Sequence, residues 1–171
     1  MPELVKTLFN ICLLRKGPED LPCDMSLMMF LVGVSLAVSV WLGTIIYDPS
    51  IAGLSSITGL FFSFVFAKLL LLKNPERFIQ TFCAMMGTVT LINLISVPVV
   101  YPLSNEELNE NLVLFFGLLS FALFVWIIVV YGFIFSRAIA STLANGVAIS
   151  VGYALLSIMI LQLFLSGRAA S

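Results

Sequence analysis

The stretch NLVLFFGLLSFALFVWIIVVYGFIFS, residues 111–136, carries no charged side chain and is rich in aromatic residues. A helix rises about 1.5 Å per residue, so crossing a hydrocarbon core of roughly 30 Å takes about 20 apolar residues. A helix also satisfies its own backbone hydrogen bonds, which lipid cannot do. The stretch therefore predicts a helix that crosses a membrane.

Four further runs also lack charge, and most of them are as long as a span requires. They cover residues 25–47, 49–67, 78–105 and 138–167. Of the 171 residues, 61% are hydrophobic and 10% are charged, whereas soluble domains carry about 25% charged residues. We expect an all-α polytopic membrane helix bundle, formed as one integral membrane domain over residues 1–171. The predicted spans are about 25–47, 51–72, 78–101, 111–135 and 141–165.

The charges between these runs alternate in sign, and this pattern predicts the orientation. Lysine and arginine accumulate in short cytoplasmic loops. Every basic residue except Arg168 falls before the first span, between the second and third, or between the fourth and fifth. The other two connections hold only acidic charges: Asp48 in one, and Glu106, Glu107 and Glu110 in the other. We expect a cytoplasmic N-terminus, an external C-terminus and, from the short loops, a bacterial inner membrane.

The fifth span has an alternative. Residues 111–167 contain Arg137 as their one charged residue, and this length is too great for a single span. Two helices joined by a tight cytoplasmic turn around Ser136–Thr142 fit the pattern best. A re-entrant hairpin in the last part would instead leave four spans and return the C-terminus to the cytoplasm.

Residues 2–16 predict an amphipathic helix. Leu4, Leu8 and Ile11 follow one helical stripe, whereas Lys6 and Asn10 lie on the other side. Such a helix can lie in the interface of the inner leaflet. Packing against the cytoplasmic end of the bundle explains the same pattern equally well, so both placements remain open.

Small residues recur every four positions in three of the predicted spans. Helices in lipid associate through close packing, which small side chains permit. The stripes are Ser35, Ser39 and Gly43 in the first span, Ser55, Gly59, Ser63 and Ala67 in the second, and Ala144, Ala148 and Gly152 in the fifth. We expect these stripes to face other helices of the same chain, and a homodimer seam is the alternative.

The residues that most enzyme and metal sites require are sparse. The chain has no histidine, and its three cysteines, Cys12, Cys23 and Cys83, form no C-x-x-C pair. No carboxylate lies near the middle of a span, and no glycine-rich phosphate loop is present. The net charge of −1 also disfavours nucleic acid as a partner. We therefore predict no catalytic, cofactor-binding or metal-binding residues.

Two hypotheses for the function remain. The first is a non-enzymatic membrane protein that scaffolds or assists other membrane components, with the lipid bilayer, other membrane proteins or a second copy as partners. The second is a carrier or channel for a small solute or lipid. For that alternative the candidate polar pocket is Asn93 and Pro98, where a proline should bend the third span beside a polar side chain, with Asn145 completing it.

The segment Leu13-Leu14-Arg15-Lys16-Gly17-Pro18-Glu19-Asp20-Leu21-Pro22 leads into the first predicted span. It is similar to the opening of small proteobacterial inner-membrane proteins. A cytoplasmic N-terminal segment followed by five closely spaced spans resembles the YIP (Ypt-interacting protein) superfamily. The resemblance implies an integral membrane protein with membrane-protein partners. The long acidic cytoplasmic domain of the eukaryotic members is missing here, so their GTPase binding is not implied.

Overall fold

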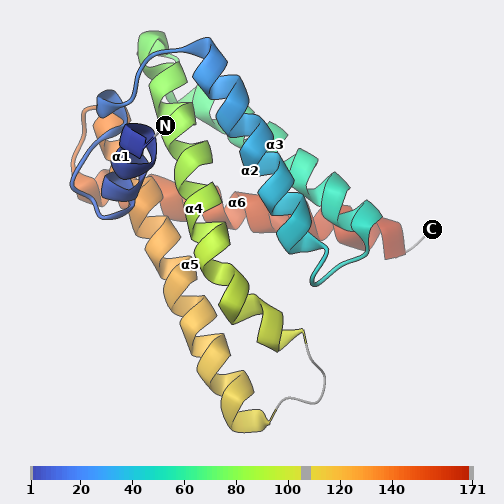
Figure 1. Cartoon of the computed structure of the whole chain (residues 1–171). Coiled ribbons are helices and arrows are strands. Elements are labelled where there is room, and N and C mark those ends of the chain that lie inside the picture. The colour runs from blue at the N-terminus through green and yellow to red at the C-terminus, as the bar shows by residue number, and fades with distance from the viewer. Residues whose placement is uncertain (1, 105–108, 170–171) are drawn as a thin grey trace.

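Six α-helices make up nearly all of the structure, a computed structural model that describes residues 2–104 and 109–169 (Figure 1). They are α1 (Pro2–Cys12), α2 (Met25–Gly43), α3 (Pro49–Leu70), α4 (Phe78–Leu103), α5 (Glu110–Ala138) and α6 (Leu143–Ala169). Two short 3-10 helices, η1 (Pro18–Asp20) and η2 (Pro75–Arg77), precede α2 and α4. The described residues contain no strand, so the prediction of an all-α bundle is confirmed. Five of the helices, α2 to α6, are long and apolar enough to cross a membrane.

Local chemistry explains where several helices begin and end. Asp24 caps α2 by accepting a hydrogen bond from the backbone N–H of Ser26, and Asn109 caps α5 through Asn111 in the same way. The N-terminal helix ends at Cys12, before the predicted end at residue 16. The chain turns there because Leu14 adopts a positive φ of 59° and the N–H of Arg15 bonds back to the Asn10 carbonyl.

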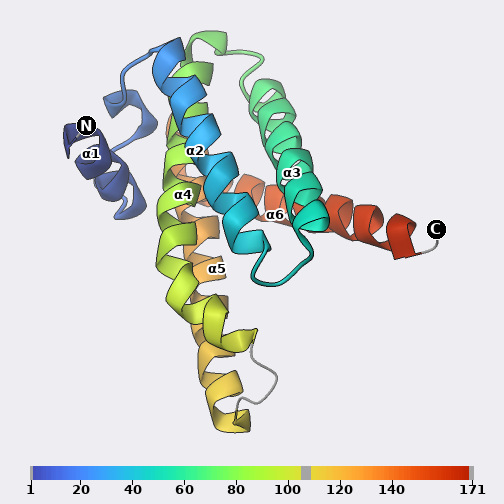
Figure 2. The same cartoon turned by 45° about the vertical axis from the view of Figure 1, so that its right-hand side comes forward.

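The helices do not run parallel. Helix α4 packs on α2 and on α5, and α2 packs on α3. In both views α6 runs across the long axes of α4 and α5, and it reaches α3 on the far side (Figure 1, Figure 2). Helix α4 continues through Pro98 and Pro102, and its last part bends away from the axis of its first part in both figures.

Burial is concentrated where α1, η1, the start of α4, the end of α5 and the start of α6 meet. We call this region the packed end, and it includes residues 81–88 of α4 and 130–138 of α5. All eight residues from Thr81 to Thr88 are buried. Within α5, every buried residue lies at or beyond Val130. The earlier part of that helix, residues 110–129, contains no buried residue, and we call it the open flank.

Helix α1 packs on the bundle. Leu8 and Ile11 are buried, and Leu8 lies directly against Gly87 of α4, where an added Cβ would come within 2.7 Å of a Leu8 methyl group. Of the two placements open from the sequence, contact with the bundle is the one seen in the structure. The opposite side of α1 leaves Val5 and Phe9 exposed.

Candidate functional site

The three residues of the predicted polar pocket are not brought together. Asn93 donates a hydrogen bond of 3.2 Å to the hydroxyl of Ser39, which joins α4 to α2. Pro98 is exposed, one turn further along α4. Asn93 therefore acts as a link between two helices, as polar side chains in membrane helices often do.

Asn145 lies at the other end of the bundle. It is exposed in the first turn of α6, where its amide donates 2.9 Å to the hydroxyl of Ser141. This turn follows the end of α5, whose Ala138 carbonyl accepts a hydrogen bond from Arg77 at the start of α4. Asn93 lies sixteen residues after Arg77, which corresponds to about 24 Å along the helix at 1.5 Å per residue. Asn93 and Asn145 are therefore far apart. Asn145 therefore does not complete a pocket with Asn93 and Pro98, as the carrier hypothesis expected.

The small-residue stripe of α3 divides into two parts. Ser63 and Ala67 are buried, and the Ser63 hydroxyl lies 2.7 Å from the hydroxyl of Tyr153 in α6. Gly59 is exposed, and an added Cβ there would meet nothing within 4 Å. Ser55 is half-buried beside a groove of about 170 Å³ between α3 and α6. The stripe faces α6 over part of its length only.

In α2 the stripe points toward its neighbours. Ser35 is buried, and Ser39 accepts the hydrogen bond from Asn93. Gly43 is close to α3, because an added Cβ would lie 3.0 Å from the Cβ of Ala52. These three residues therefore connect α2 to both α3 and α4.

The stripe of α6 points away from the other helices. Ala144 and Ala148 are exposed, and Gly152 is half-buried, with nothing within 4 Å of an added Cβ. The close approach to α5 is made instead by Gly146 and Ser150. An added Cβ on Gly146 would be 2.7 Å from the Cβ of Ser136 and would also strike the Gly132 carbonyl.

A signal for this contact is present in the sequence. Gly132 and Ser136 are four residues apart in α5, and Gly146 and Ser150 are four residues apart in α6. Small residues at this spacing are typical of helices in close contact in a membrane. The spacing alone does not say which of two overlapping stripes in one helix is used, and in α6 the sequence prediction chose the other.

A polar cavity of about 440 Å³ opens at the packed end, and sequence reasoning did not identify it. It lies between η1, the start of α4 and the turn from α5 to α6. Its walls are Pro18, Glu19, Arg77, Gln80, Thr81, Ser136, Arg137, Ala138, Ala140 and Ser141. The sequence signal for this cavity is a pair of basic residues: Arg77 at the start of α4 and Arg137 near the end of α5.

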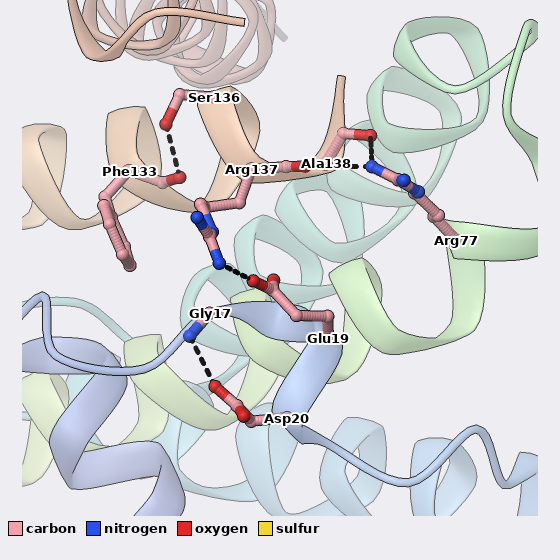
Figure 3. A network of polar contacts seen from close by, with 8 residues as sticks. All are labelled: Gly17, Glu19, Asp20, Arg77, Phe133, Ser136, Arg137 and Ala138. Atoms are coloured by element: carbon pink, nitrogen blue, oxygen red, sulfur yellow. Dashed lines mark hydrogen bonds and ion pairs between the residues drawn. The ribbon is translucent and has the colours of Figure 1, made fainter. Parts of the chain in front are cut away.

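Two arginines hold this region together (Figure 3). Arg137 forms an ion pair with Glu19 of η1. Arg77 donates 3.1 Å to the carbonyl of Arg137 and 3.3 Å to that of Ala138, so its charge lies against the negative end of the α5 dipole. Three segments that are far apart in sequence thereby meet around one cavity.

One residue that lines the cavity has a buried polar atom without a partner. Thr81 is only 1% exposed, and its hydroxyl makes no hydrogen bond with any residue that the structure describes. The neighbouring Gln80 is already engaged, because its amide donates 2.8 Å to the Leu21 carbonyl. Buried hydroxyl groups nearly always have a partner, so a free one beside a polar cavity indicates where a ligand atom could bind.

The described residues include no group of three or more histidine, cysteine, aspartate or glutamate side chains placed to hold a metal ion. Compared with protein-family models, curated proteins and solved structures, the chain matches none of them.

Proposed function

We propose that the chain is a non-enzymatic integral membrane protein that scaffolds or assists other membrane proteins through the open flank of α5. The observation that carries this proposal is the contrast within one helix. Residues 130–138 pack against α4 and α6, whereas the preceding residues 110–129 contain no fully buried residue, although Ile127 packs on the core.

The open flank presents large side chains on several sides. Those that are more than half exposed are Leu114, Phe115, Leu118 and Phe121. Lipid covers such a surface in an isolated protein. A second membrane helix gains close van der Waals packing with it, which is the main term that drives helix association in a bilayer. The proposed partner is therefore a transmembrane helix, either of another membrane protein or of a second copy.

Photocrosslinking in intact membranes tests this function. A photoreactive amino acid at Phe121 should give a discrete adduct with a transmembrane peptide, which mass spectrometry can assign to a partner or to a second copy. The matched control is Phe61 of α3, which is 69% exposed but lies outside the open flank. Only lipid adducts at both positions, or the same peptide at both, would contradict the proposal.

We also propose an N-terminus in the cytoplasm, an external C-terminus and a bacterial inner membrane, as in a YIP-like arrangement of five spans. The distribution of basic residues supports this orientation. The fifth predicted span forms α6, which runs across α4 and α5 (Figure 2). Whether this helix crosses the membrane decides on which side the C-terminus lies. A paired reporter fused after Ser171, active on one side of the membrane only, should give the external signal. A cytoplasmic signal would favour the re-entrant alternative.

A further inference from the structure

We propose that the cavity between Arg77, Thr81 and Arg137 binds a phosphate group, carried by a phospholipid headgroup or by a free phosphate ion. This inference is independent of the open flank and goes beyond the scaffold function. It rests on four features of the cavity, namely its charge, its unpaired donors, its depth in the membrane and its size.

The charge of the cavity favours an anion. Two guanidinium groups and one carboxylate, that of Glu19, line its wall, which leaves one net positive charge. Arg77 contacts the α5 carbonyls through one of its nitrogens, and Arg137 contacts Glu19 through one. Guanidinium groups have five N–H donors and match phosphate oxygens well, so both can hold a phosphate while keeping these contacts.

The cavity also has hydroxyl donors for phosphate oxygens. The Thr81 hydroxyl has no partner in the described residues, although the side chain is buried. The Ser141 hydroxyl accepts from Asn145, so its own hydrogen remains available. The Ser136 hydroxyl is engaged with the Phe133 carbonyl at 2.8 Å and is not needed. Thr81 lines the cavity, but its hydroxyl is buried within the wall, so a phosphate oxygen reaches it only by displacing part of that wall. The contact would then satisfy a group that is otherwise costly to leave unpaired.

The cavity lies at the depth of lipid headgroups. Arg77 and Arg137 mark the ends of the uncharged runs in α4 and α5, where a membrane helix leaves the hydrocarbon. The volume of about 440 Å³ falls in the range of ordinary ligand pockets. A phosphate attached to part of a glycerol unit fits such a space, and the acyl chains would remain in the bilayer.

Lipid retention by the full chain in mild detergent tests the proposal. Native mass spectrometry would measure binding of phosphatidylglycerol against a phosphate-free galactolipid with the same acyl chains. We expect clear preference for the phospholipid, and about a tenfold loss for Thr81→Val, since a hydrogen bond to a charged group is removed. Arg77→Gln should lose as much or more, and Arg77→Lys should retain part of the binding.

The matched control is Thr88→Val, also in α4 and fully buried, whose hydroxyl bonds to the Ala84 carbonyl of its own helix. It should bind the phospholipid as the wild type does. Equal retention of the two lipids, or wild-type binding by Thr81→Val, would overturn the proposal. If Thr81→Val fails to fold, Ser141→Ala, at a half-buried position between α5 and α6, carries the same prediction.

A second arm separates the two sources of phosphate. Inorganic phosphate is titrated against the detergent-solubilised protein by calorimetry. Binding that Thr81→Val weakens, together with displacement of the phospholipid, would identify the free ion as a ligand. Phospholipid binding without any response to millimolar phosphate would identify the headgroup. Absence of both kinds of binding would refute the site.

Discussion

The packed end and the open flank lie on the same helix, yet they are built on different principles. At residues 130–138, α5 is enclosed by α4, α6 and η1, and aromatic rings fill the space between the helices. Residues 110–129 are similarly apolar, yet none of them is fully buried; Ile127 still packs on the core, and the Ile128 carbonyl accepts a hydrogen bond from Ser150 of α6. In a membrane, hydrophobicity does not distinguish an inside from an outside, because lipid is as apolar as a leucine side chain.

Small residues mark the difference between these two regions. The packed part of α5 contains Gly132 and Ser136, which admit the backbone of α6. In the open flank an added Cβ on Gly117 would meet nothing within 4 Å. Close contact between two helices therefore requires small residues on both helices at the same height. Gly146 is the small residue that α6 places opposite Gly132 and Ser136.

The largest effect is expected for a large side chain at the packed end. Phe135 is fully buried, with ring centroids 5.7 Å from Phe66 and 5.8 Å from Tyr131. Phe135→Ala should lower the free energy of unfolding by about 3–5 kcal/mol, through lost contacts and the cavity left behind. Unfolding in bicelles with increasing denaturing detergent measures this change.

The matched substitution in the open flank is Phe121→Ala. Phe121 is 63% exposed, so the change should cost about 0.5 kcal/mol or less. Similar losses for the two variants would mean that the flank is covered, as it would be in a tight dimer. In that case the packed end and the open flank would differ in burial only in the isolated chain and not in the assembled protein.

The next largest effect is expected for two glycines of α6, Gly146 and Gly152. Their replacement by alanine should change the free energy of unfolding in opposite directions. Gly146→Ala places a Cβ 2.7 Å from that of Ser136, which forces α5 and α6 apart and should cost about 2 kcal/mol. Gly152→Ala meets open space in the same helix. It should stabilise by about 0.5–1 kcal/mol, because alanine is the better helix former. The same unfolding measurement compares them, and equal signs would contradict the assigned seam.

The ion pair at the packed end should contribute less. Arg137 and Glu19 are 54% and 46% exposed, and solvent screens a pair of this kind. Glu19→Gln should therefore lower the free energy of unfolding by about 0.5 kcal/mol. A double-mutant cycle with Arg137→Gln isolates the pair, and a coupling above about 2 kcal/mol would show that the pair is shielded from water.

The sequence predicts the class of this fold because uncharged length is a direct physical requirement for crossing a membrane. Helix ends are also predictable where a cap is local, as at Asp24. It is harder to predict which small-residue stripes contact another helix. Gly59 and Gly146 are the same residue type, and they differ only because Gly146 lies against α5 whereas an added Cβ on Gly59 would meet nothing within 4 Å. The cavity at Arg77, Thr81 and Arg137 depends on three distant segments, and no local pattern records their meeting.

The smallest effect concerns two of the three cysteines, Cys12 and Cys23, which precede α2 in the sequence. Cys12 is buried against the bundle, and burial raises the pKa of its thiol to about 11, whereas Cys23 is exposed. N-ethylmaleimide at pH 7.5 should therefore label Cys23 within minutes and leave Cys12 unmodified until the protein unfolds, because the thiolate is the reactive form. Peptide mass spectrometry measures both sites in one sample, and rapid labelling of Cys12 would show that α1 detaches from the bundle.

The raised pKa also fixes the sign of a pH dependence. The neutral thiol of Cys12 is favoured in the folded protein, so its contribution to stability is fully present below pH 9, the ordinary value. That contribution is lost as the pH rises from 9 toward 11, where the unfolded chain releases the proton first. The difference in unfolding free energy between the wild type and Cys12→Ala should be constant below pH 9 and shrink above it. A difference that grows with pH would place the thiol in a polar environment and α1 away from the packed end.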